Sequence, residues 1–584
     1  MQYWCHKKHY LDQEKLRQTH CRLSGARIKQ YSTTFLLVGS MASSAHLRAA
    51  GDFSLSNYDA IQQSMIAEFA LAYQDSATAL HNYTVLAIKS NSTTIKQRAL
   101  NIALEQNDLH AALDIATHWV VQEPTDVPAL FYLSHIALKA HEYELAAETL
   151  DKILNIDANA DLEQILAGIA PEEPEDQEIL IQALRSSKER NNPSILALIA
   201  GLEAQNGQLD QALTTINKAL KKRGKVTGYI LMKANLLSAL GQEEETRNWY
   251  AKSSRKHRDN VDVRLAEAKY LIKINASNEA LTKLDSLIKK WPDQEEALFI
   301  AGLTSIDLKK YEKAEKYLVE LRNSAEYQNE AYYYLAVNAE RKQHFETAKA
   351  YYRLVDGSLY TVSRRSLISI YTLQNKPNDA LRFLTQERVN YPQHASFLYQ
   401  AQADILKRMN NKAAAMRLLD EAIKNLPDDP ELIYSEVLML DPHTDKDKLE
   451  KLLNQLLSIE PNSPTYLNAY AYTLALQNRR LDDARRFVEH ALEYAPEQAS
   501  ILDTLGFICY LQNDFSTSAK VLEKAYLISG SVNIGVRYAR SVYMLGDLQK
   551  FSTVLQQLKQ KHPNDPQLDQ LNTLLLPQQL KKSS

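Results

Sequence analysis

A spacing of about 34 residues runs through most of this chain and limits its fold more than any other feature. Pro427, Pro461 and Pro496 lie 34 and 35 residues apart, and Pro292 and Pro392 stand in a similar sequence context. A period of this length is typical of one supersecondary unit that repeats along the chain. The spacing therefore predicts a stacked array of short units rather than a set of separate compact domains.

Within each period, residue size follows a fixed order. Large or apolar residues occupy positions 4, 7, 11, 24 and 27, and small residues occupy positions 8 and 20. The unit that starts at Glu295 shows this order in Leu298, Ala301, Gly302, Ala314, Leu318 and Leu321. Two antiparallel helices explain the pattern, because the small residues let the helices approach and the large ones fill the seam. About 14 units fit between residues 60 and 565, and those starting at 193, 227, 261, 295 and 329 are in phase.

Composition agrees with an all-α chain. Only 15 glycines and 17 prolines occur in 584 residues, too few for the many tight turns of a large β protein. Hydrophobic residues at 45% and charged residues at 24% exclude a wholly disordered chain. The formal net charge of −3 gives no overall electrostatic reason to expect nucleic acid as a partner.

The pattern divides the chain into five segments. We expect a polar leader over 1–58, an N-terminal array over 59–160, an irregular acidic junction over 161–192, a C-terminal array over 193–565 and a polar tail over 566–584. The unit from residue 430 carries Asp-Pro-His-Thr-Asp where its helices should turn, so its first helix should end early.

The leader has two interpretations. Residues 27–45 contain a cationic start, a short apolar stretch and small residues, which is the layout of a weak secretory signal. The apolar stretch is too short to span a bilayer. The alternative is a disordered leader before the first helix. Cys5 and Cys21 could form one bridge or remain two free thiols, and neither case fixes the compartment.

A search for catalytic chemistry finds little. His141-Glu-Tyr-Glu-Leu145 resembles a zinc-protease helix, but Leu145 stands where the second histidine should be. Phosphate-binding glycine loops and the GxSxG turn are absent from the sequence, and the repeats leave no room for a catalytic domain. We expect no enzyme activity, no cofactor and no metal site.

The repeat order resembles that of tetratricopeptide repeats. The resemblance implies an all-α, right-handed superhelical solenoid in which the first helix of each unit lines a concave surface that binds proteins. Positions 2, 5, 6, 9, 12 and 13 would point into this groove, and tyrosine and arginine there are typical of binding hot spots. The candidate partner-binding residues are Tyr132, His135, Phe299, Ile300, Leu303, Tyr333, Tyr334, Arg365, Tyr472, Phe507, Tyr510 and Arg537. The alternative is that many of these side chains cover seams between units.

A more specific likeness lies near the C-terminus. Leu467-Asn-Ala-Tyr-Ala-Tyr-Thr-Leu474, followed by Ala495-Pro-Glu-Gln-Ala-Ser-Ile-Leu-Asp-Thr-Leu-Gly-Phe507, is similar to a family of bacterial repeat lipoproteins. Members tether to the outer membrane, and at least one is an adaptor for a carboxyl-terminal processing serine protease. The chain departs from the family at Ser40, which stands where the lipid-bearing cysteine should be, so lipid anchoring and membrane association stay open.

These observations favour a non-catalytic adaptor. Its expected partners are proteins, with a processing serine protease and its envelope substrates implied by the resemblance, and a periplasmic or outer-membrane-associated location follows from the same source. The alternative is a cytoplasmic assembly scaffold with no protease link.

Overall fold

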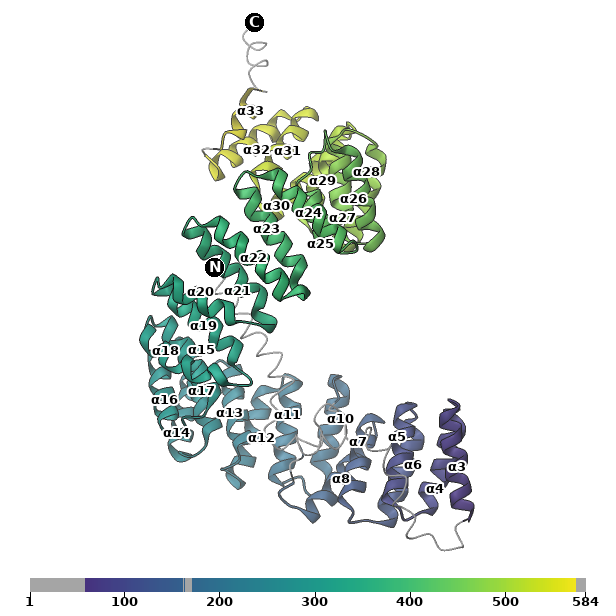
Figure 1. Ribbon diagram of the computed structural model, residues 1–584. Coiled ribbons are helices and arrows are strands. Elements are labelled where there is room, and N and C mark those ends of the chain that lie inside the picture. The colour runs from purple at the N-terminus through teal and green to yellow at the C-terminus, as the bar shows by residue number, and fades with distance from the viewer. Residues whose placement is uncertain (1–57, 161, 163–170, 564, 574–584) are drawn as a thin grey trace. The chain divides into compact units, whose positions relative to one another are not determined.

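The computed structural model describes residues 58–160, 162, 171–563 and 565–573 and contains only helices there (Figure 1). The predicted leader and signal segment, with Cys5 and Cys21, lie outside the described residues. The chain divides into two compact units, Met1–Tyr327 and Gln328–Ser584. This border falls inside the expected C-terminal array. No described helix is both long and apolar enough to cross a bilayer.

Unit 1 is a series of antiparallel helix pairs. The pairs are α3 (Tyr58–Ala72) with α4 (Ser76–Lys89), α5 (Thr93–Glu105) with α6 (Leu109–Gln122), α7 (Val127–Lys139) with α8 (Tyr143–Ile156), α11 (Pro193–Gln205) with α12 (Leu209–Lys222), α13 (Thr227–Ala239) with α14 (Glu243–Lys256), α15 (Val261–Lys273) with α16 (Ser277–Lys290), and α17 (Glu295–Asp307) with α18 (Tyr311–Glu320). A short 3-10 turn, η1 (Leu321–Asn323), follows α18.

Unit 2 continues in the same way. Its pairs are α19 (Gln328–Arg341) with α20 (Phe345–Leu354), α21 (Tyr360–Leu373) with α22 (Pro377–Asn390), α23 (Ala395–Arg408) with α24 (Lys412–Asn425), α25 (Pro430–Val437) with α26 (Lys446–Ile459), α27 (Pro464–Leu476) with α28 (Leu481–Tyr494), α29 (Ala499–Leu511) with α30 (Phe515–Ser529), and α31 (Val532–Met544) with α32 (Leu548–Lys561). The turns η2 (Gly357–Leu359) and η3 (Pro392–His394) precede α21 and α23, and α33 (Gln567–Thr573) follows the last pair.

The predicted register of the repeat is confirmed. First helices begin at Pro193, Thr227, Val261 and Glu295, which are the predicted starts, and the next begins at Gln328, one residue early. The turn inside most pairs contains a residue with positive φ, and Asn or Gly fills most of these positions because both tolerate the left-handed region. The all-α tetratricopeptide architecture therefore follows from turn chemistry and apolar spacing together.

Small residues at position 8 set the distance between paired helices. Gly302 of α17 lies so close to α18 that an added Cβ would come within 2.7 Å of the Leu318 side chain. Ala314 and Leu318 are fully buried in the same seam. The small residue at position 8 thus lets the helices approach, and the large residue at position 24 fills the seam, as the repeat pattern predicted.

The irregular segments also contain helices. Helix α25 ends at Val437 after eight residues, which confirms its early termination before the Asp441 turn. Helix α10 (Pro174–Ser186) packs against α8 and α11 across the acidic junction. At the C-terminus Leu568 and Leu571 of α33 are buried against the last pair, so this part of the tail closes the final seam.

Candidate partner-binding cluster

Three first helices of unit 2 bring together a set of aromatic and charged side chains. Helices α27, α29 and α31 lie in sequence, and each contacts the next (Figure 1). Position 5 of the three repeats carries Asn468, Asp503 and Arg537, and position 9 of the first two carries Tyr472 and Phe507. Since equivalent positions of stacked repeats face the same way, these five side chains share one surface. Tyr472, Asp503, Phe507 and Arg537 form what we call the Arg537 cluster.

Arg537 holds the cluster together. Its guanidinium donates to Asp503 Oδ2 at 2.7 Å and to the Tyr472 hydroxyl at 3.2 Å. Its central carbon lies 4.7 Å from the Phe507 ring centroid and 5.7 Å from the Tyr472 ring. A planar guanidinium stacks readily on aromatic rings such as these two, and the carboxylate fixes its position. One arginine thus links three successive repeats.

Burial shapes the electrostatics of the cluster. Burial raises the pKa of the Asp503 carboxyl above its ordinary value, although the Arg537 charge opposes this rise. Burial lowers the pKa of the Arg537 guanidinium, but the charge of Asp503 and the contact with the Tyr472 hydroxyl outweigh burial, so the pKa is raised overall. Asp503 Oδ1 and Asn468 Oδ1 are buried and lack a hydrogen-bond donor among the described residues. Buried acceptors without a donor are costly, so a partner that draws these side chains outward and supplies N–H groups would relieve this cost.

The other candidates of unit 2 are spread over separate repeats. Tyr333 and Tyr334 of α19 are half-buried, with ring centroids 5.2 Å apart, and burial raises the pKa of Tyr333. Arg365 of α21 is exposed, with its guanidinium 5.5 Å from the Phe397 ring. Tyr510 of α29 is half-buried against Phe515, at 5.4 Å between centroids.

Two candidates of unit 1 lie on α7. Tyr132 is half-buried and stacks on Trp119 at 5.9 Å, and burial raises its pKa. His135 is half-buried, and burial together with the nearby Lys139 charge lowers its pKa to about 4. The imidazole is therefore neutral at physiological pH.

The remaining three candidates lie on α17. Phe299 is fully buried, and its ring lies 5.1 Å from the Tyr327 ring, so this side chain fills a seam and is not open to a partner. The Phe299 ring packs near the 3-10 turn that follows α18. The repeat pattern does not predict this turn. Ile300 and Leu303 are half-buried.

Sequence reasoning omitted Asp503 and Asn468. A signal for both was present, because they occupy position 5, one of the positions expected to face the groove. Only aromatic and cationic residues were selected there, whereas the buried carboxylate is what fixes Arg537 in place.

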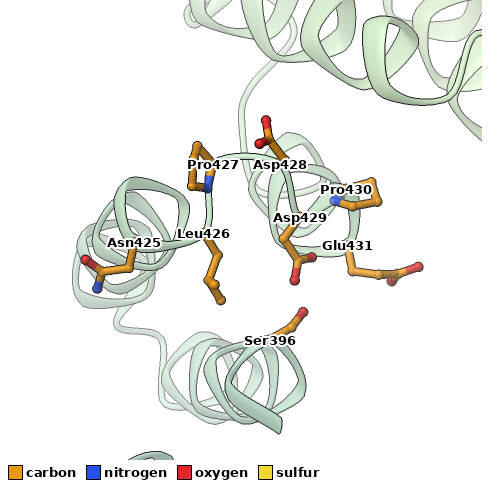
Figure 2. A pocket seen from close by; sticks show the side chains of 8 residues that line it. All are labelled: Ser396, Asn425, Leu426, Pro427, Asp428, Asp429, Pro430 and Glu431. Carbon is orange, nitrogen blue, oxygen red and sulfur yellow. The ribbon is translucent and has the colours of Figure 1, made fainter. Parts of the chain in front are cut away.

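A shallow hollow of about 550 Å³ also lies in unit 2, beside the turn between α24 and α25. Figure 2 shows Asp429 and Ser396 facing the gap, while Asp428 and Glu431 point away from it. Asp429 accepts a hydrogen bond from the Leu432 amide at 3.1 Å, so it caps α25. The hollow presents no convergent set of side chains.

Neither a metal nor a reactive thiol is indicated in the part of the chain that the structure describes. No group of three or more metal-ligating side chains lies among those residues. Cys509 is buried in α29, and burial raises the pKa of its thiol to about 11, so it is protonated at neutral pH.

Comparison with known proteins agrees with the repeat geometry. No family model matches the chain. The TPR repeat-containing protein PA4667 of Pseudomonas aeruginosa is 26% identical over 472 residues, which is 80% of each chain. The chain therefore has the all-α superhelical fold of tetratricopeptide repeats. Tetratricopeptide repeat proteins generally mediate protein–protein interaction.

Solved tetratricopeptide structures resemble the chain only distantly. The Cut9–Hcn1 hetero-tetramer of the APC/C aligns with 88% of this chain and 96% of its own, at 13% identity and a TM-score of 0.32. TTC0263, a thermophilic repeat protein of Thermus thermophilus, aligns with 31% of this chain and 99% of its own, at 17% identity and a TM-score of 0.27. At TM-scores this low, neither likeness bears on function.

Proposed function

We propose that this tetratricopeptide-repeat protein is a non-catalytic adaptor that binds a protein segment on the Arg537 cluster. The observation that supports this most strongly is the Arg537 side chain, which rests on two aromatic rings and links α27, α29 and α31. A rigid arginine and tyrosine set loses little entropy when a partner binds.

The chemistry of the cluster fits an extended polypeptide. Asp503 Oδ1 and Asn468 Oδ1 are buried, so the amides of such a segment would reach them once these side chains turn outward, and would then supply the donors that they lack among the described residues. The Tyr472 and Phe507 rings, 6.2 Å apart, would pack on an apolar side chain of the same segment.

The finer proposal concerns the identity of the partner. The likeness of residues 467–507 to repeat lipoproteins supports a carboxyl-terminal processing serine protease as partner, with envelope proteins as its substrates and the periplasm as the compartment. The Arg537 cluster lies on helices of this same stretch and of α31, which follows it. The other candidates of unit 2, Tyr333, Tyr334, Arg365 and Tyr510, would extend the contact along that unit.

A cross-linked pull-down from the native cells tests both levels of the proposal. The baits are the full wild-type chain and the full chain with Asp503→Asn and Arg537→Gln. Both substitutions replace a charged side chain by a neutral polar one, so the variant should still fold. Truncating a hot-spot arginine costs about 2 kcal/mol or more, which predicts roughly 30-fold weaker capture of the partner. The matched control is Arg486→Ala, an exposed residue on α28, the second helix of its pair.

The outcomes separate the coarse proposal from the fine one. Equal capture by wild type and the double variant, with equal melting temperatures, would contradict the Arg537 cluster as binding surface. In the other informative outcome, capture depends on the cluster, all captured partners are cytosolic, and the bait still carries residues 1–45. This outcome would contradict the proposed protease partner and the proposed periplasmic location, and it would support a cytoplasmic scaffold.

A further inference from the structure

The near-zero net charge of the chain conceals a strong local excess of positive charge in unit 1. Residues 218–258 contain eleven Lys or Arg residues and three glutamates, a formal charge of +8 in a chain whose total is −3. The three glutamates, Glu243–Glu245, lie in the first turn of α14. The cations instead gather toward the opposite ends of the second helices.

The turns that follow α12, α14 and α16 form one edge of unit 1. Asn260 donates to the Thr227 hydroxyl at 2.6 Å, which ties two of these turns together. A Cβ at Gly224 would lie 4.0 Å from Lys256 Nζ, and Lys290 Nζ lies 3.5 Å from the Arg258 carbonyl oxygen. The three helix ends are therefore adjacent.

This edge carries eight exposed cations, which we call the basic edge: Lys221, Lys222, Lys225, Arg255, Lys256, Arg258, Lys289 and Lys290. The exposed carboxylates beside it are Asp259, Asp262 and Asp293. Among the described residues only Lys290 has an ion pair here, with Asp259. Most of the positive charge thus faces solvent without a partner carboxylate.

The repeat fold does not require this charge. Cations at a helix C-terminus interact favourably with the helix dipole, so a few would be expected on structural grounds alone. Of the seven described second helices of unit 2, α26, α28 and α30 have no basic residue in their last turn, α20, α22 and α24 have one each, and only α32 has two. The concentration of cations at α12, α14 and α16 is therefore a local property of unit 1.

The length of the basic edge and the tryptophan beside it indicate which anionic partner the edge would bind. Its cations project from three adjacent turns, over a length on the order of 20 Å given usual helix spacings, which matches an extended flat surface better than a single peptide side chain. Trp291 lies at the same edge, half-buried, with Lys290 Nζ 4.5 Å and the Arg264 guanidinium 5.4 Å from its ring centroid. Tryptophan beside lysine and arginine is typical of surfaces that sit at lipid headgroups.

We infer that the basic edge binds the surface of a membrane that contains anionic phospholipids. Each lysine or arginine near such a surface adds attraction that salt screens, so several must act together. The inference is independent of the Arg537 cluster, which lies in unit 2.

Co-sedimentation with vesicles tests the inference on the full chain. The probes are phosphatidylcholine vesicles with and without about a third of phosphatidylglycerol. The test variant is Lys221→Glu, Lys222→Glu, Arg255→Glu and Lys256→Glu together. The control reverses four exposed lysines of unit 2, Lys407, Lys424, Lys451 and Lys520, and so has the same net charge.

Wild type and the unit 2 control should bind the phosphatidylglycerol vesicles, and the edge variant should bind at least about tenfold more weakly. Binding should fall as NaCl rises from about 0.05 to 0.3 M. Absence of wild-type binding, equal loss in both variants, equal binding to pure phosphatidylcholine, or tighter binding to a DNA duplex than to the vesicles would each overturn the inference.

Discussion

At the residue scale, close helix contact depends on the absence of a single methyl group. A Cβ at Gly506 of α29 would lie closer to Leu522 Cγ than two carbon atoms can approach, and Cγ is the branch point of that side chain rather than its flexible end. Gly201 of α11 is also helical, but a Cβ there would meet nothing nearer than Met232 Cε at 3.9 Å. The same substitution should therefore have opposite effects at the two positions.

We expect Gly506→Ala to destabilise unit 2 by about 1–3 kcal/mol, because the added carbon overpacks the seam. Gly201→Ala should stabilise unit 1 by about 0.5–1 kcal/mol, because alanine is the better helix former and space is available. Urea unfolding of both variants, followed by circular dichroism, measures the two shifts. A stabilising Gly506→Ala would contradict the seam geometry.

His135 gives a pH dependence with a defined sign. Its pKa in the folded chain is about 4 against an ordinary value of 6.5, so the folded state binds fewer protons than the unfolded state between these values. Stability should therefore fall as the pH drops from about 6.5 toward 4, by about 1–2 kcal/mol after allowance for solvent screening of a half-buried group.

The His135→Leu variant should lose this part of the pH dependence. Melting temperatures at pH 7.5 and pH 5 provide the measurement, with the exposed His110→Leu as control. An identical pH response in wild type and His135→Leu would show that another group is responsible.

Residue patterns predicted the seams better than the candidate site. Leu318 and Leu522 could be placed in the core because their position in the repeat fixes their neighbour. The bond between Arg537 and Tyr472 joins residues 65 positions apart and depends on how three repeats stack. Its geometry cannot be obtained from the spacing within one unit.

At the element scale, unit 2 contains a helix end closed by a buried arginine. Helix α20 stops at Leu354, and Arg364 of α21 donates to the carbonyl oxygens of Tyr352 at 2.9 Å and Val355 at 2.7 Å. The same guanidinium pairs with Glu387 Oε2 at 2.6 Å and is fully buried. A cation that donates to the free carbonyls of a helix C-terminus replaces the helix turn that is missing there.

We expect Arg364→Met to destabilise unit 2 by about 3–5 kcal/mol. The substitution leaves the Glu387 carboxylate buried without its cation, and it removes the hydrogen-bond donor of the carbonyl oxygens at the end of α20. The double variant Arg364→Met with Glu387→Gln should recover part of this loss, since no buried charge remains. Denaturant unfolding measures both. Equal stability of the single and double variants would contradict a role for the ion pair.

The sequence pattern anticipated the early end of α25 but not the short helices α18 and α20. Asp441-Pro442 marks the first case directly, because proline disfavours helix in the residue before it. Helices α18 and α20 contain ten residues each, and a 3-10 turn comes before the next helix in both cases. The Arg364 contact that closes α20 joins two different helices, so local periodicity does not reveal it.

At the scale of the whole molecule, the chain assigns different surfaces to different units. Unit 1 carries the basic edge, and unit 2 carries the Arg537 cluster. The sequence indicated one long C-terminal array, whereas the chain divides into its two compact units between Tyr327 and Gln328. The likeness of neighbouring repeats concealed that border, because each repeat follows the same spacing on both sides of it.

Photo-cross-linking in the native cells tests the central claim, partner binding on the first helices of unit 2, most directly. A photoreactive phenylalanine analogue replaces Tyr510 of α29 in one variant and Glu489, exposed on α28, in the other. We expect the analogue at position 510 to give a discrete covalent adduct, which Arg537→Ala should abolish, and the analogue at position 489 to give none. Adducts of equal yield at both positions, or an adduct at position 489 alone, would contradict binding on this surface.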